Sequence, residues 1–177
     1  MFVKHTVESA PAGARRFVEA TVKHRGYLPA AVGLLASSPH LLEGFLKVSA
    51  LFEASTLDPL AREVVILTMA TRNGCHLCVA MHTARLTELD ADPATISALR
   101  NQEPLEDERL EAVRAFTIAV LGTTGDVSER EREAFLSHGY TPQNALEVVL
   151  GIGAYTMSTL ANRLTGAPID AELAQYA

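Results

Sequence analysis

The sequence predicts an all-α fold, a single helical domain over residues 1–177 built around a helix hairpin. Apolar residues recur at helical spacing in nearly every segment, and capping residues or prolines stand at most of the expected helix starts. Alternating runs typical of strands are missing. The 177-residue length suits one domain of ordinary size.

The amino-acid composition excludes several classes of function. Hydrophobic residues make up 48% and charged residues 20% of the chain, which predicts a folded globular protein. The net charge is −6 and no Lys/Arg-rich block occurs, so a nucleic-acid partner is not expected. The N-terminus lacks a secretory signal, and the most apolar window, Leu146–Ala161, is too short to span a membrane. We therefore expect a cytoplasmic protein, with this window as a central helix or an oligomer contact.

Four helices are expected in the first half, each with an apolar face: 14–24, 39–55, 59–72 and 75–89. Asp58 and Pro59 start the third of these as N-cap and first-turn residue. Asn73-Gly74 is a strong helix breaker and ends it. Two helices joined by so tight a turn pack as a hairpin, the expected core of the fold.

Four further helices are expected in the second half: 93–100, 106–120, 129–139 and a long last helix from 142. Asp92-Pro93 and Thr141-Pro142 mark two of the starts, and Ser128 caps the segment EREREAFLSHG. The segment GTTGDVS is a loop, and TGAPID closes the core.

Two segments suggest an internal two-fold repeat. AREVVILTMA, which contains Glu63, and ALEVVLGIGA, which contains Glu147, share five of ten positions. Extending the alignment places Cys75, Cys78 and His82 opposite Thr159, Asn162 and Gly166, so only the first segment would carry the thiol chemistry. Two apolar helices also resemble each other by chance, so duplication and chance remain alternative explanations.

The only two cysteines, Cys75 and Cys78, are three residues apart, and His82 follows four residues later. On a helix of 3.6 residues per turn the three side chains share one face. Cys75 would lie in the first turn, where free backbone N–H groups favour a thiolate. The hairpin could also bring the Glu63 carboxylate near His82 or the thiols, forming a proton-moving cluster.

Other roles are open for these residues. The cysteines could be buried apolar filling, or zinc ligands together with His82 and either Glu63 or a water molecule. His82 could be a structural histidine bonded to a carbonyl group, and Glu63 could hold a helix junction. His76 is expected to face solvent.

The stretch STLDPLAREVVILTMATRNGCHLCVAMHTARL resembles the alkylhydroperoxidase D-like, carboxymuconolactone decarboxylase superfamily. The redox branch of that superfamily has a Glu, then after eleven residues a Cys-x-x-Cys-x-x-x-His. Glu63, Cys75, Cys78 and His82 match this spacing position by position. Weaker similarity extends from about Pro29 to the segment NRLTGAPID, and so covers most of the chain.

The resemblance implies an all-helical subunit in homotrimers or hexamers, with peroxidase or dithiol–disulfide exchange activity. We expect no cofactor and no metal. It implies that Cys78 attacks a hydroperoxide and becomes a sulfenic acid, which Cys75 resolves to a disulfide. Glu63 and His82 would relay the proton, and a thiol or lipoyl-type electron donor would regenerate the thiols.

One position departs from the family pattern. The best-studied members have a histidine immediately before the second cysteine, where this chain has Leu77. His76 points about 200° from Cys78 around a helix and cannot simply replace it. We therefore expect thiol redox chemistry more firmly than efficient peroxide turnover. The alternatives are a carboxymuconolactone decarboxylase-like enzyme for a small carboxylated lactone and a zinc-stabilised helical interaction protein.

Overall fold

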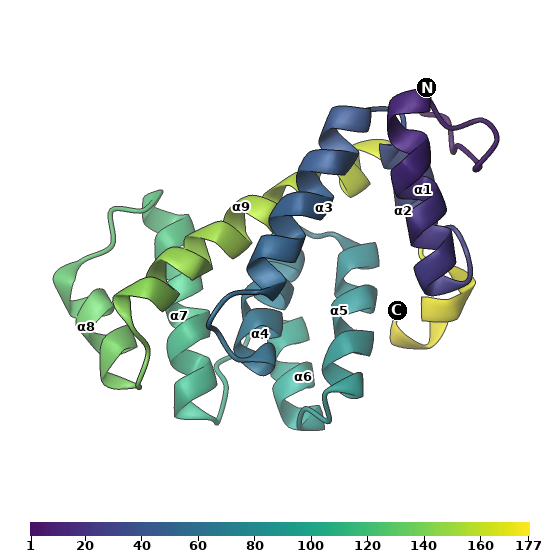
Figure 1. The fold of residues 1–177 in the computed structure, drawn as a ribbon. Coiled ribbons are helices and arrows are strands. Elements are labelled where there is room, and N and C mark those ends of the chain that lie inside the picture. Colours follow the sequence, from purple (N-terminus) through teal and green to yellow (C-terminus); the bar gives the residue numbers. More distant parts are fainter.

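The computed structural model describes all 177 residues, which form nine α-helices and one 3-10 helix and no strand (Figure 1). The predicted all-α class is confirmed. The elements are α1 (Ala12–Arg25), α2 (Ala30–Leu35), α3 (Pro39–Glu53), α4 (Pro59–Arg72), α5 (His76–Glu88), α6 (Pro93–Asn101), α7 (Glu108–Thr123), α8 (Glu129–Ser137), α9 (Pro142–Thr165) and η1 (Ala171–Tyr176).

The helix starts follow from capping residues that the sequence displays. The side chains of Asp58, Asp92 and Thr141 each accept a hydrogen bond from a backbone N–H of the first turn, and proline follows each of them. Proline fits there because the N–H it lacks has no partner inside the helix anyway. Ser128 and Glu131 form a full capping box at the start of α8.

Helix α4 lies at the centre of the molecule and packs against α5, α6, α7 and α9. Nine of its residues are buried, including the run Glu63–Ala70, so it is apolar nearly all round. Helices α3 and α9 run beside one another along the same side of the molecule (Figure 1), and α9 contacts α3, α4 and α7. The helix hairpin of the prediction is the α4–α5 pair.

The contact between α3 and α9 depends on a glycine. A Cβ atom built on Gly151 would lie 2.6 Å from the Phe52 ring, closer than two carbon atoms can approach. Phe52 is fully buried, and its ring also meets Tyr155 edge to face at 6.1 Å. Gly151 therefore lets the phenyl ring rest directly on the backbone of α9.

A smaller apolar cluster lies at the end of the molecule where α1 and α2 meet α3. It includes Val18 and Leu42, both without exposed surface. Asp170 ties the C-terminal segment to this end, because its carboxylate accepts a hydrogen bond from the backbone N–H of Ala30 at 3.0 Å. No helix of the structure combines the length and apolar character that crossing a membrane requires.

Several boundaries differ from the sequence prediction by one to three residues. The helix expected over 106–120 runs from Glu108 to Thr123, because Asp107 acts as its N-cap. Helix α2 and the 3-10 helix η1 were not predicted as separate elements; each has only six residues, too few for a helical pattern.

The two similar ten-residue segments of the suggested repeat lie in α4 and in α9, and each follows a capped helix start with a proline. Helix α9 continues without a break where α4 ends at Arg72, so the structural correspondence is limited to this part of the two helices.

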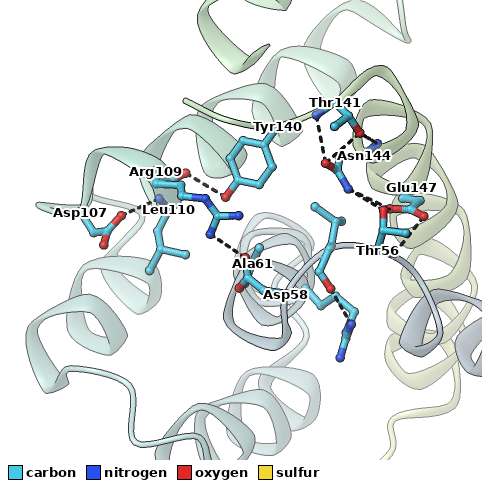
Figure 2. A network of polar contacts seen from close by, with 12 residues as sticks. Thr56, Asp58, Ala61, Asp107, Arg109, Leu110, Tyr140, Thr141, Asn144 and Glu147 are labelled. Atoms are coloured by element: carbon cyan, nitrogen blue, oxygen red, sulfur yellow. Dashed lines mark hydrogen bonds and ion pairs between the residues drawn. The ribbon is translucent and has the colours of Figure 1, made fainter. Parts of the chain in front are cut away.

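A polar network joins the α3–α4 connection to α9 and α7 (Figure 2). The Glu147 carboxylate accepts hydrogen bonds from Thr56 N at 3.0 Å and Thr56 Oγ1 at 2.7 Å. At the α7 side, Arg109 donates to Asp58 at 2.7 Å, and its backbone carbonyl accepts from the Tyr140 hydroxyl. Glu147 thus holds a helix junction, the role that the sequence left open for its counterpart Glu63.

Candidate active site

The turn between α4 and α5 positions both cysteines. Asn73 caps the end of α4, and Gly74 takes φ +62°, a left-handed conformation that glycine adopts without strain. The turn is fixed to α9 from two positions. Asn73 Nδ2 donates to Thr159 Oγ1 at 2.8 Å, and Arg163 Nη1 donates to the Asn73 carbonyl. The first residue of the Cys-x-x-Cys motif therefore follows a rigid connection.

Cys75 is the N-cap of α5, and its Sγ accepts a hydrogen bond from the Cys78 backbone N–H at 3.4 Å. The two sulfur atoms lie 2.50 Å apart as a disulfide pair, and the Cα atoms are 5.3 Å apart, within the usual range for bonded cysteines. Each cysteine is only 2% exposed. The helix start thus brings the thiols to bonding distance within one subunit.

Glu63 and His82 meet beside this pair. Glu63 Oε2 lies 2.7 Å from His82 Nδ1, and the two residues are 4% and 8% exposed. The hairpin prediction that a carboxylate of α4 reaches the histidine of α5 is confirmed. The bond fixes the imidazole by Nδ1 and leaves Nε2 without a hydrogen bond in the chain. His82 therefore bonds to a carboxylate and not to the carbonyl group considered for it, and Glu63 links α4 to α5 through this bond.

Tyr155 of α9 covers the imidazole. Its ring meets that of His82 edge to face, with centroids 5.2 Å apart. Its hydroxyl lies 3.4 Å from Ser49 Oγ. Burial raises the pKa of Tyr155 to about 12, and the hydrogen bond with Ser49 lowers it only in part. Tyr155 is thus a neutral wall of the site at physiological pH. No pattern in the sequence points to Tyr155, because its place depends on how α9 crosses the hairpin.

Asn162 of α9 also belongs to the site. Its Nδ2 donates to Cys78 Sγ at 3.4 Å, and the residue is 6% exposed. Its Oδ1 is buried and has no hydrogen-bond partner. Sequence reasoning did not assign Asn162 a role, although the internal alignment places it opposite Cys78.

The structure also places His76 and Leu77, the two residues beside the cysteines that the sequence singled out. His76 is exposed, as expected, and lies outside the cluster. Leu77, at the position of the family departure, is 2% exposed and packs in the main hydrophobic core. A histidine there would be buried among apolar side chains. No group of three or more His, Cys, Asp or Glu side chains is arranged to hold a metal ion, so the zinc alternative lacks a ligand set.

Comparison with known proteins agrees with this architecture. Residues 39–119 match the model of the carboxymuconolactone decarboxylase family. A peroxidase-related protein from Ralstonia eutropha JMP134, an alkylhydroperoxidase AhpD core, superimposes with a TM-score of 0.84 at 20% identity over 97% of this chain and 93% of that one. No curated protein matches the chain.

Two further structures share the fold. A peroxidase-related protein from Silicibacter sp. TM1040 has a TM-score of 0.78 at 21% identity, over 95% of this chain and 91% of that one. The debrominase Bmp8, solved in complex with 2,3,4-tribromopyrrole, has a TM-score of 0.74 at 14% identity, over 93% of this chain and 89% of that one. The chain thus matches the carboxymuconolactone decarboxylase family over residues 39–119 and shares the fold of an alkylhydroperoxidase AhpD core over nearly its whole length.

Proposed function

We propose that the chain is a thiol-dependent peroxidase or dithiol–disulfide oxidoreductase that uses Cys75 and Cys78. The observation that carries this proposal is the buried Glu63–His82 pair beside two cysteines at disulfide distance. A carboxylate that orients an imidazole next to a thiol is the usual arrangement for activating a sulfur nucleophile.

In the proposed reaction, the Cys78 thiol passes its proton to His82, and the thiolate attacks the terminal oxygen of a hydroperoxide. The O–O bond breaks, the alkoxide takes the proton from His82 to leave as an alcohol, and Cys78 holds a sulfenic acid. The Cys75 thiolate then attacks the Cys78 sulfur, so the disulfide forms and the hydroxide takes up the proton that the Cys75 thiol released and leaves as water. Two electrons pass from the thiols to the peroxide. The N-cap position of Cys75 favours its thiolate form.

The cycle requires a donor that returns two electrons to the disulfide. A thiol or lipoyl-type dithiol fits this role, because a dithiol reduces a disulfide by two successive exchanges. Such a cycle operates in a compartment that keeps thiols reduced, consistent with the predicted cytoplasmic location. Since both cysteines are 2% exposed, we expect a small dithiol to react faster than a bulky protein thiol.

We also propose that the chain forms a homo-oligomer, a trimer or hexamer, through α9. Leu146, Leu160 and Leu164 are 73%, 54% and 72% exposed on that helix, an apolar surface that a second copy would cover. Light scattering measures the mass in solution. A monomer at micromolar concentration contradicts this part of the proposal.

The decisive experiment is mass spectrometry of the reduced chain before and after one equivalent of hydroperoxide. We expect loss of two thiols and an intramolecular Cys75–Cys78 bond. In Cys75→Ser the sulfenic acid on Cys78 should accumulate and be trapped by dimedone, and in Cys78→Ser neither product should form. If both thiols stay reduced under conditions that oxidise a known cysteine peroxidase, the peroxidase proposal is wrong.

The family match over residues 39–119 supports one other candidate, a decarboxylase-like enzyme for a small carboxylated lactone. In that case the thiols would be dispensable. The Cys75→Ser/Cys78→Ser double variant should then turn over such a lactone as fast as the parent chain does. The thiol proposal predicts instead that neither protein catalyses this reaction. The 2,3,4-tribromopyrrole bound by Bmp8 is a second compound to assay with the parent chain and with the double variant.

A further inference from the structure

We infer that Asn162 is a further catalytic residue of the thiol site, which stabilises the Cys78 thiolate through Nδ2 and accepts the hydroperoxide O–H through Oδ1. The inference rests on the proposed function, because it assigns the role of Asn162 in the same reaction. It adds an amide from α9 to the reacting groups, which otherwise all come from α4 and residues 75–82.

The two sulfur atoms have separate hydrogen-bond donors. Cys75 Sγ accepts from the Cys78 backbone N–H at 3.4 Å, and Cys78 Sγ accepts from Asn162 Nδ2, also at 3.4 Å. No other donor reaches Cys78 Sγ. A buried thiolate is costly unless donors face it, because burial disfavours the charged form. Asn162 therefore supplies the hydrogen bond that the attacking sulfur needs.

The position of Asn162 is fixed on both sides along α9. Thr159, three residues earlier, accepts a hydrogen bond from Asn73 at 2.8 Å, and Arg163, the next residue, donates to the Asn73 carbonyl. Both contacts reach the turn that leads directly into Cys75. The same turn thus sets where the cysteines lie and where the amide lies, so their relative position does not depend on a mobile loop.

The amide oxygen of Asn162 accepts no hydrogen bond in the structure. Asn162 Oδ1 is buried without a partner, although nearly all buried polar atoms in folded proteins have one. A hydroperoxide carries one O–H donor, on the oxygen that the sulfur attacks. When the O–O bond breaks, that oxygen moves to Cys78 with its hydrogen, so the sulfenic acid O–H can keep the same bond to Oδ1. The amide thus serves the thiolate and the transferred oxygen in turn.

The test uses Asn162→Leu, which has nearly the same shape and neither polar atom, in a Cys75→Ser background so that one thiol remains. The rate of alkylation by iodoacetamide is measured against pH. We expect the pH of half-maximal rate to rise by about one unit, the effect of one hydrogen bond to a charged group. Ser158→Ala is the matched control: Ser158 is buried on the same helix and bonds only to a backbone carbonyl, so its profile should not move.

The role of Oδ1 is measured at a pH above both midpoints, where all the protein is thiolate. There Asn162→Leu should alkylate at the parent rate but react with tert-butyl hydroperoxide about tenfold more slowly, as expected for one lost hydrogen bond. Equal rates with the peroxide would overturn the role of Oδ1, and an unchanged alkylation profile would overturn the role of Nδ2.

The alkylation profile needs no peroxide, so it separates this inference from the proposed function. If the parent chain never reacts with peroxides but Asn162→Leu still shifts the profile, the thiolate role stands and the peroxidase proposal fails. Circular dichroism checks that the variant is folded. If it is not, Asn162→Ser, which keeps a hydroxyl donor, should show a smaller shift than Asn162→Ala, and equal shifts would contradict the inference.

Discussion

Glu63 Oε2 and His82 Nδ1 lie 2.7 Å apart in the interior of the protein and join α4 to α5 beside the two cysteines. The bond orients the imidazole and leaves Nε2 without a hydrogen bond in the chain, and we propose that this atom exchanges the proton. The buried carboxylate sets both the tautomer and the direction of the ring.

We expect Glu63→Gln to slow oxidation of the thiols by hydroperoxide about a hundredfold, because the amide cannot stabilise a protonated imidazole as the carboxylate does. Stopped-flow single-turnover oxidation measures this rate. Glu147→Gln is the matched control, since Glu147 occupies the corresponding position of α9 but bonds to Thr56 and to neither cysteine nor His82. Its oxidation rate should equal that of the parent chain.

His82→Asn should cause a similar loss of rate with little change in the secondary structure. Asparagine keeps a short polar group near Glu63 but lacks an atom equivalent to Nε2, so proton transfer fails while the buried carboxylate can retain a donor. His76→Asn provides the control, because His76 is exposed and lies outside the cluster. A comparable loss in both variants would contradict the relay assigned to His82.

The junction at Glu147 should make part of the stability depend on acid pH. Burial alone would raise the pKa of Glu147, but hydrogen bonds from Thr56, Gln143 and Asn144 outweigh it and lower the pKa to about 2. A lowered folded-state pKa stabilises the protein above the ordinary value of 4.5, and this stabilisation is lost as the pH falls towards 2.

Because the Glu147 carboxylate is partly open to solvent, we expect the loss to be about 1 kcal/mol between pH 5 and pH 2. Urea unfolding at a series of pH values measures it. Glu147→Gln should be less stable at pH 7 and should lack this part of the pH dependence. Parallel pH profiles for the two proteins would show that the network does not hold the carboxylate in its charged form.

Gly151→Ala should lower the free energy of unfolding by about 1–3 kcal/mol, because the new methyl group would overlap the fully buried Phe52 ring. Gly44→Ala is the matched control: Gly44 lies within α3, and a Cβ there meets no atom within 4 Å. That variant should gain up to about 1 kcal/mol from the higher helix propensity of alanine. Thermal or urea unfolding distinguishes the two, and equal stability changes would contradict the close approach of α3 and α9.

The sequence predicted the helical elements well where local chemistry decides them. Asp58-Pro59, Asn73-Gly74 and Thr141-Pro142 mark the ends of α4 and the start of α9 because capping and turn formation involve only neighbouring residues. Short elements such as α2 and η1 were missed for the opposite reason: six residues hold too little periodicity to distinguish a helix from a loop.

The sequence by itself determined the spacing of Glu63, Cys75, Cys78 and His82, and therefore that two thiols and a histidine share one helix face beside a tight turn. Local geometry suffices for this, since residues within one hairpin have few ways to be placed. Only the tertiary structure decided that Tyr155 and Asn162 complete the site. Their positions depend on how α9 crosses the hairpin, and that crossing is set by packing such as Phe52 against Gly151, between residues about a hundred positions apart.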